Sequence, residues 1–173
     1  GGLCGVIYFI SGGQISDCSA RVDMLISGDN CYSIGGFVGY NGGNIRRCYS
    51  EGKMTVTGEV DYSHIGGFAG YNGQEIRYCY ANFDISTSGM TKQGGYTDPY
   101  KSVGGFCGSN YNRIYSSYAL GKVNTDLLKT NSGGFCGVHG GTSGNITNCF
   151  WNTETSLLVV GYNISNISPA TVT

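Results

Sequence analysis

The sequence predicts an all-β protein, a parallel β-solenoid of about five turns with three short strands in each turn. Three observations predict this fold. A motif recurs about every thirty residues, turn-forming residues separate short apolar segments, and no segment shows helical periodicity. A β-propeller is the alternative, but its blades need four strands in about forty residues or more. One repeat per solenoid turn is therefore favoured.

The repeat begins with two glycines followed by Leu or Phe, near residues 1, 35, 66, 104 and 133. An isoleucine follows, then a cysteine or serine three residues later, and then an aromatic residue in four of the five copies. The three expected strands surround the Gly-Gly-Phe, Ile-x-x-Cys-Tyr and Gly-Lys-Val segments. The repeats define one domain over residues 1–156, and residues 157–173 depart from the pattern.

Stacked turns would place equivalent residues in columns. One column alternates in charge, at Asp23, Lys53, Asp84 and Lys122. Opposite charges on neighbouring strands attract by about 0.2 to 1 kcal/mol per pair, so this alternation supports the register. A second column consists of Asn41, Asn72 and Asn110, whose amides are expected to bond along the stack.

Composition restricts the class of protein. A chain of 173 residues needs only one domain, and 12% charged residues with a net charge of -1 leave no basic stripe for nucleic acid. No apolar run is long enough for a membrane span. Eight cysteines, with many Asn, Ser, Thr and Gly residues, fit an oxidising extracellular location. Because Gly1 lies inside a motif, we expect the natural chain to extend upstream.

The recurring Gly-Gly-Phe-Val-Gly-Tyr-Asn, Ile-x-x-Cys-Tyr and Gly-Lys-Val segments resemble the GLUG repeat of secreted and surface proteins, over about residues 1–156. Residues 149–156 are similar to the segment that often closes such arrays. The resemblance implies large surface proteins, some adhesin-like and some with a peptidase domain elsewhere, and it carries over no catalytic residue. We expect a non-catalytic structural or adhesive module whose partners are other copies or neighbouring domains.

The glycine-rich stretch of residues 35–43 could suggest a phosphate loop. That site needs a following helix and usually a Gly-Lys-Ser/Thr sequence, and neither is predicted here. The glycines instead fit close packing between turns. No cofactor is expected, and no catalytic pair either, because carboxylates do not recur beside a base.

The cysteines leave two disulfide hypotheses open. Zinc sites need close pairs, whereas Cys136 and Cys149 are the closest here at thirteen residues, so no metal is expected. One hypothesis pairs cysteines across the interior, Cys4 with Cys18 and Cys136 with Cys149. The other pairs column neighbours, Cys48 with Cys79 and Cys107 with Cys136, although parallel Cβ vectors make that geometry poor. Cys31 lies outside the pattern.

Aromatic residues are the candidate binding groups. One column contains Tyr49, Tyr80, Tyr118 and Phe150, and Tyr40 and Tyr71 flank it. The residue after an inward-facing one on a strand faces outward, so these rings should form an exposed ladder. Two interpretations stay open: the rings cover the sheet by stacking on each other, or they bind glycan or another protein.

The segment 157–173 has two candidate roles. The ends of an open solenoid carry unpaired edges, so this tail could cap the last turn or pair with the first turn of another copy and build a filament. Three sequons mark candidate N-glycosylation sites, at Asn145, Asn163 and Asn166.

Overall fold

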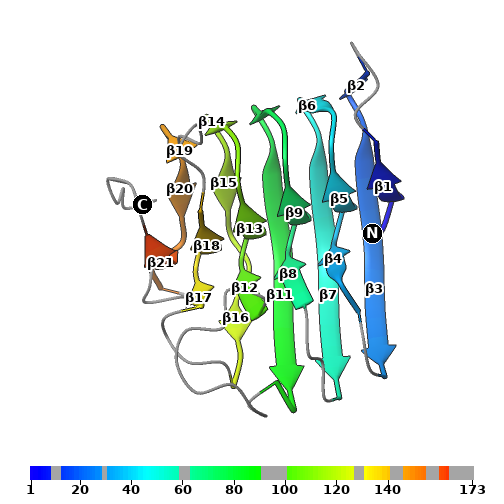
Figure 1. Ribbon diagram of the computed structural model, residues 1–173, viewed down its shortest axis with the longest axis vertical. Helices are drawn as coiled ribbons and strands as arrows, with labels where there is room; N and C mark the ends of the chain where they lie inside the picture. The colour runs from blue at the N-terminus through cyan, green and yellow to red at the C-terminus, as the bar shows by residue number, and fades with distance from the viewer. Residues whose placement is uncertain are drawn as a thin grey trace.

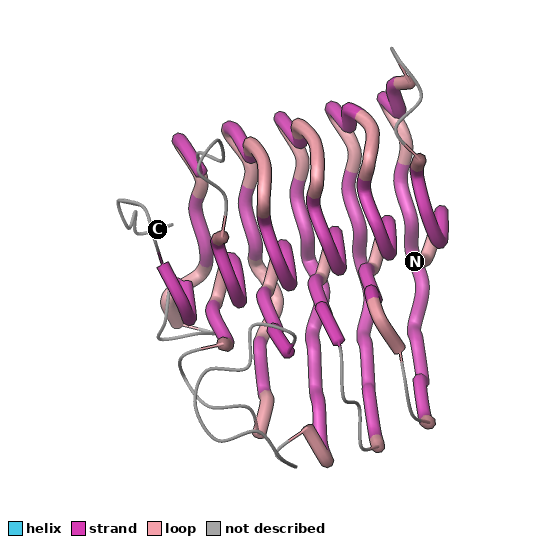
Figure 2. Tube along the Cα trace, in the orientation of Figure 1, coloured by secondary structure: helices cyan, strands magenta, loops and turns pink. Residues whose placement is uncertain are grey.

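The computed structural model describes residues 1–8, 13–28, 31–58, 63–90, 101–126, 131–140, 146–154 and 160–163. These residues form four sheets in which every strand pairing is parallel, and they contain no helix (Figure 1). The chain winds as a β-solenoid, with strands of successive turns side by side (Figure 2). The predicted fold class is confirmed. Within the described ranges, no helix could cross a membrane.

The strands fall into four sheets. The front sheet runs β1 (Cys4–Ile7), β5 (Val38–Asn41), β9 (Ala69–Asn72), β13 (Cys107–Asn110), β18 (Cys136–His139), β21 (Val160–Asn163). The top sheet runs β2 (Gln14–Ser16), β6 (Asn44–Arg46), β10 (Ile76–Arg77), β14 (Ile114–Tyr115), β19 (Ile146–Thr147). The long-strand sheet runs β3 (Ser19–Ser27), β7 (Tyr49–Thr57), β11 (Tyr80–Ser88), β15 (Tyr118–Ala119), β20 (Phe150–Trp151), and β16 (Val123–Asn124) also pairs with β11. The lower sheet runs β4 (Ser33–Gly35), β8 (Ser63–Gly66), β12 (Lys101–Gly104), β17 (Ser132–Gly133).

The prediction of five turns with three strands each needs correction. Four turns contribute strands to all four sheets, beginning at β4, β8, β12 and β17, whereas the first turn has no described strand in the lower sheet. The residues before each glycine pair form the additional lower strand. In β7 and β11 the aromatic and Gly-Lys-Val segments lie in one nine-residue strand, because nothing interrupts their pairing.

A sharp corner separates the top sheet from the long-strand sheet. One residue in each of the five turns has a positive φ there: Asp17, Arg47, Tyr78, Ser116, Asn148. This corner divides the predicted Ile-x-x-Cys-Tyr strand into two strands. This corner is hard to predict from the sequence, because no glycine occupies the position and, of these five residues, only Asp and Asn adopt positive φ comparatively readily.

The upper core is a stack of phenylalanines. Their rings lie 4.7 to 4.9 Å apart between centroids, and each is almost fully buried: Phe37, Phe68, Phe106, Phe135. Behind this stack the backbones approach closely, so a Cβ on Gly36 would collide with the carbonyl oxygen of Gly67. The glycine pair therefore serves packing between turns, as the sequence predicted.

The lower core lies between the lower and long-strand sheets. It includes Ile65, Val103, Met54, Ile85 and Phe83. Val22, Gly52 and Phe83 are register partners in successive turns, so bulky residues alternate with glycine. Gly52 has φ 144° and faces the Val22 carbonyl, where any side chain would collide.

The charged column has the expected register but a different contact. Asp23 pairs in register with Lys53, and Lys53 with Asp84. The carboxylate of Asp23 accepts a hydrogen bond from the backbone N–H of Lys53 at 2.9 Å, and Asp84 does the same for Lys122. The aspartates therefore satisfy backbone donors beside the glycines of the next turn.

The asparagine column forms the predicted ladder. The Nδ2 of Asn41 donates to Oδ1 of Asn72 at 2.7 Å, and Asn72 donates to Asn110 at the same distance. The ladder continues to His139, whose Nδ1 lies 3.0 Å from the Asn110 amide nitrogen. All four side chains are fully buried. An amide suits this position because it both donates and accepts.

Replacing Asn72 tests this ladder. Asn72→Ala leaves buried groups of Asn41 and Asn110 without their partner, so we expect a loss of about 1 to 3 kcal/mol in the free energy of unfolding, measured by urea denaturation. The exposed Thr55 provides the control, and Thr55→Ala should stay within about 0.5 kcal/mol of the unaltered chain. Equal stability of the two variants would contradict the proposed contribution of the ladder.

Candidate functional site

The aromatic ladder predicted from sequence lies on the outer side of the long-strand sheet. Register pairs align Tyr49, Tyr80, Tyr118 and Phe150. The rings of Tyr49 and Tyr80 stack at 4.7 Å and those of Tyr80 and Tyr118 at 5.1 Å. Tyr118 is 36% exposed and Phe150 38% exposed. We call these four residues the long-strand ladder.

Two of the three hydroxyls of the long-strand ladder, those of Tyr49 and Tyr80, have hydrogen-bond partners from the same chain. Tyr80 donates to Glu51 at 3.0 Å, and Arg21 donates to the Tyr49 hydroxyl at 3.4 Å. Arg21 and Glu51 form an ion pair at 2.8 Å. Burial, with the hydrogen bond to Glu51, raises the pKa of Tyr80 to about 12. These contacts favour a covering role for this ladder.

A second tyrosine stack stands on the front sheet. Tyr40 and Tyr71 stack at 4.9 Å, and Tyr71 and Tyr111 at 5.3 Å. The predicted ladder does not include Tyr111. Ser109 is the register partner of Tyr71, and Tyr111 lies two residues beyond it. An aromatic residue directly after Asn110 was the available signal.

A hollow of about 520 Å³ lies beside the end of this stack. It is lined by Gly1, Gly5, Val6, Tyr8, Tyr32, Ser33, Tyr40. Val6 takes the column position that Tyr40 has in the next turn, so among the described residues of this column no ring stacks on that face of Tyr40. Tyr8 is 76% exposed and Tyr32 66% exposed. We call this feature the tyrosine hollow; its aromatic rings and hydroxyls suit a sugar ring.

A cluster of polar side chains joins the lower and front sheets. Nδ1 of His64 lies 2.9 Å from the hydroxyls of both Ser102 and Ser109, and these hydroxyls are 3.0 Å apart. A serine beside a histidine can be a nucleophile and its base. Both serines are fully buried, so neither hydroxyl is accessible to a substrate in this conformation.

All eight cysteines are free thiols. Seven donate to a carbonyl oxygen two residues away at 3.1 to 3.4 Å: Cys4, Cys18, Cys48, Cys79, Cys107, Cys136, Cys149. Ser117 makes the same bond where a turn lacks the cysteine. The thiols thus act as small core donors, and neither disulfide hypothesis is realised in this structure. Among the described residues, no group of three or more His, Cys, Asp or Glu could hold a metal ion.

Burial keeps several of these thiols neutral. It raises the pKa of Cys107 well above its usual range and that of Cys149 to about 12. Burial also raises the pKa of Cys79, whose sulfur accepts a hydrogen bond from the backbone N–H of Cys48 in the preceding turn. A neutral thiol is a poor nucleophile and a poor metal ligand.

The described part of the C-terminal segment, residues 160–163, continues the stack. β21 has the sequence Val-Gly-Tyr-Asn, identical to β5, and pairs with β18 in the same register as earlier turns. That identity was the signal that the sequence analysis missed. Asn163 of the candidate sequons lies in β21, in register with His139. Asn145 and Asn166 lie outside the described residues.

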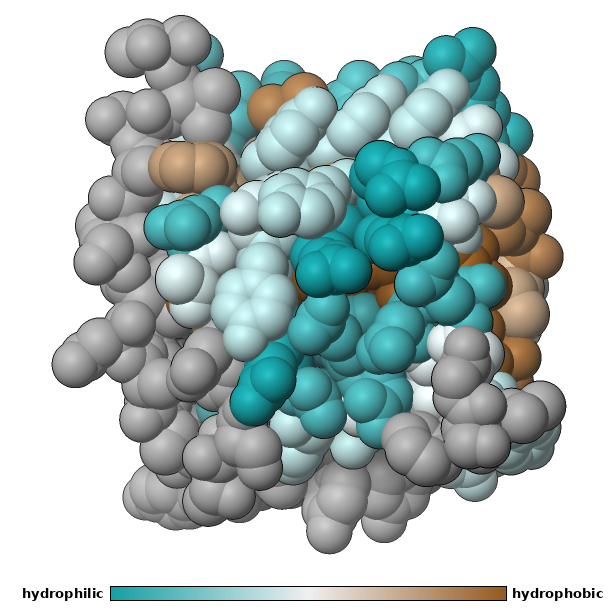
Figure 3. All heavy atoms as spheres, turned by 90° about the horizontal axis from the view of Figure 1, so that it is seen from above, coloured by the Kyte–Doolittle hydropathy of each residue, from teal (hydrophilic) through white to brown (hydrophobic). Residues whose placement is uncertain are grey.

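The first turn exposes apolar residues at the N-terminal end of the stack. Leu3 is 48% exposed, Val6 46% and Leu25 79%. Leu3 occupies the column in which Phe37 of the next turn is fully buried. Figure 3 shows hydrophobic residues gathered at this end, on the right of the view. Among the described strands, β1, β2 and β3 each have a neighbour on one side only.

Comparison with known families agrees with this geometry. Residues 30–57 and 61–86 match the model of the GLUG motif, and these segments span β4 to β7 and β8 to β11. The chain therefore contains GLUG repeats, each of which forms one solenoid turn here. Neither the curated proteins nor the solved structures yield a match. GLUG repeats on a β-solenoid are consistent with a structural or adhesive repeat module.

Thiol labelling tests the assignment of the cysteines. With Ellman's reagent at pH 8 and no reductant, we expect the half-buried Cys4, Cys18 and Cys31 to react quickly in the folded chain. The five buried thiols should react only on unfolding, so that guanidinium reveals all eight. Fewer than eight thiols in denaturant would instead restore the disulfide hypotheses.

Proposed function

We propose that the chain is a non-catalytic structural or adhesive module of an extracellular surface protein, and that its first turn pairs with another β-solenoid end to build a fibre. The observation that carries this proposal is the first turn, where the nine-residue strand β3 pairs with a described strand on one side only and apolar side chains are exposed. Open edges of this kind are templates for another strand. The foremost partner is a second copy of this chain.

Charges on the first turn support a solenoid partner. Asp17 and Arg21 each contact an opposite charge in the second turn: Arg47 at 2.6 Å for Asp17 and Glu51 at 2.8 Å for Arg21. Asp17 and Arg21 can each also contact a strand of another molecule, on the side that faces away from the second turn. A partner turn that repeats the basic and acidic order of the second turn would complement these columns.

The extracellular location rests on the GLUG repeats and on the composition, which is rich in Gly, Asn, Ser and Thr. Because the cysteines are free thiols in this structure, they do not support an extracellular location. Fibre assembly would cover the apolar end, which suits a module that works by joining others.

Charging the open edge tests the assembly. In sedimentation velocity over a concentration series, the unaltered chain should form species that grow with concentration. Leu25→Lys should give monomers, because lysine on an edge strand opposes pairing with another edge. Thr55→Lys is the control, since Thr55 is the register partner of Leu25 on the internal strand β7. A monomeric unaltered chain at every concentration, or equal loss in the control, would refute the fibre.

The tyrosine hollow favours a second candidate function, binding of a neutral carbohydrate. Sugar rings stack on aromatic faces while tyrosine hydroxyls bond to their hydroxyl groups. The exposed rings of Tyr8 and Tyr32, which line the hollow together with Tyr40, provide both.

Two tyrosine variants distinguish the hollow from the long-strand ladder. In affinity electrophoresis with neutral polysaccharides, Tyr8→Ser should weaken binding about fivefold to tenfold, the loss of roughly one stacking contact. Tyr118→Ser, on the opposite sheet, should leave binding unchanged. The reverse result would assign binding to the ladder, and no retention by any neutral polysaccharide would exclude this candidate.

A further inference from the structure

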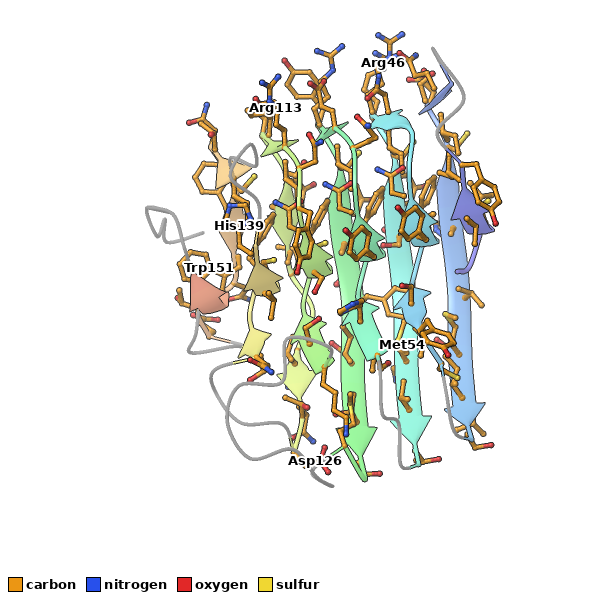
Figure 4. All side chains as sticks on the ribbon, in the orientation of Figure 1. Arg46, Met54, Arg113, Asp126, His139 and Trp151 are labelled. Carbon is orange, nitrogen blue, oxygen red and sulfur yellow. The ribbon has the colours of Figure 1, made fainter. Side chains whose placement is uncertain are left out.

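The basic residues are spread along the sequence, but the arginines gather in space. Four of the five arginines of the chain lie in the top sheet, at its corner or directly before its strand β14: Arg46, Arg47, Arg77, Arg113. They come from three successive turns. Figure 4 shows Arg46 and Arg113 projecting from the upper edge of the solenoid, away from the core. We call this surface the arginine edge.

The arginine edge carries an excess of positive charge. Its described acidic residues are Asp17 and Glu75, which pair with Arg47 at 2.6 Å and with Arg77 at 3.4 Å. Arg46 and Arg113 form no ion pair within the described part of the chain. The edge is thus positive in a chain whose net charge is -1.

The environment of these two arginines leaves their charge in place. With the Gln14 amide turned so that its oxygen faces Arg46, that oxygen accepts hydrogen bonds from Nε and Nη2 at 2.9 Å. The neutral amide of Gln14 binds the Arg46 guanidinium but does not neutralise its positive charge. Arg113 is exposed. The two residues lie two turns apart, about 9 to 10 Å along the solenoid axis.

The shape of the edge selects an extended ligand. Its strands are two or three residues long, and the top sheet contributes no residue to the hollow described above. A ligand must therefore contact several turns in succession. Tyrosines lie between the charges: Tyr78 is 60% exposed, and the Arg77 guanidinium lies 6.0 Å from the centre of its ring.

We propose that the arginine edge binds a linear anionic polysaccharide laid along the solenoid axis. Arg46 and Arg113 would contact carboxylate or sulfate groups, which the planar guanidinium binds through two parallel hydrogen bonds. The exposed ring of Tyr78 offers a face for the sugar between them. This site differs in place and in ligand charge from the tyrosine hollow.

Nucleic acid fits this edge less well. Duplex binding typically uses about six to ten phosphate contacts, and the edge offers two uncompensated arginines. Single strands are held in a positively charged groove with several stacking platforms, whereas this edge projects outward and carries one largely exposed ring.

A matched pair of double variants tests the proposal. Arg46→Gln with Arg113→Gln removes two charges from the edge, in the second and fourth turns of the stack. Lys53→Gln with Lys122→Gln removes two charges from the exposed side of the long-strand sheet in the same two turns. The lysine backbone bonds to Asp23 and Asp84 survive this change. Circular dichroism establishes that each variant folds.

Binding is measured by biolayer interferometry at pH 7 against immobilised polygalacturonate, dextran sulfate, neutral dextran and a single-stranded DNA oligonucleotide. The unaltered chain should bind at least one of the two anionic polysaccharides, more weakly as salt rises, and should not bind dextran. The arginine variant should lose at least about tenfold in affinity and the lysine variant less than about twofold. Preference between the two polymers identifies carboxylate or sulfate as the recognised group.

Three results would overturn the proposal: no binding to either anionic polysaccharide, equal losses in the two variants, or tighter binding to the DNA than to both polysaccharides. If the arginine double variant fails to fold, Arg113→Glu alone takes its place, because Arg113 is exposed and forms no ion pair among the described residues. It should likewise weaken binding to the anionic polysaccharide.

Discussion

Parallel stacking in register is the constraint on which the rest of this structure depends. Within the stack a side chain lies beside its register partners from the adjacent turns, so a column that repeats one residue type needs a residue that packs well against itself. Phenylalanine does so by stacking its ring, and asparagine by donating and accepting through one amide. Glycine does so by letting backbones approach, as at Gly36 and Gly67.

The surfaces with functional interest arise where this self-pairing stops. Val6 replaces a tyrosine in its column, and the face of Tyr40 opens into a hollow. Leu3 has no turn before it in the described chain, and its column of core residues becomes exposed. At the top corner the side chains point away from the core, so packing does not prescribe their type and arginines can gather there.

The proposed contacts use separate parts of the solenoid. Assembly would take place at the open first turn, neutral carbohydrate would lie in the tyrosine hollow near the same end, and an anionic polysaccharide would lie along the arginine edge. A ligand along the edge follows the solenoid axis, which is also the direction in which a fibre would grow. Joining copies end to end would therefore lengthen the anionic-polysaccharide site and raise its avidity.

The repeat itself could be predicted from sequence because its signals are local and recur in every turn. The glycine pair, the phenylalanine and asparagine columns and the Asp23 to Lys53 register are all present in the order of the residues. The family match covers two of these repeats, at residues 30–57 and 61–86. Even β21 could have been found, because its four residues repeat those of β5.

Other features depend on distances across turns, which the sequence does not contain. Arg47 and Tyr78 adopt positive φ at the corner although neither is glycine. The residue types therefore did not indicate that each turn divides into four strands. The positions of the cysteines in the repeat predict candidate disulfides, whereas in the structure the thiols are free and bond to local carbonyls, as at Cys48 and Cys79. Arg46 and Arg113 are 67 positions apart in the chain, and only the winding of the solenoid brings them to one edge. The sequence by itself determined the repeat and its columns, since these follow from residue type and spacing; the tertiary structure alone decided which side chains share a surface, since that depends on how each turn bends.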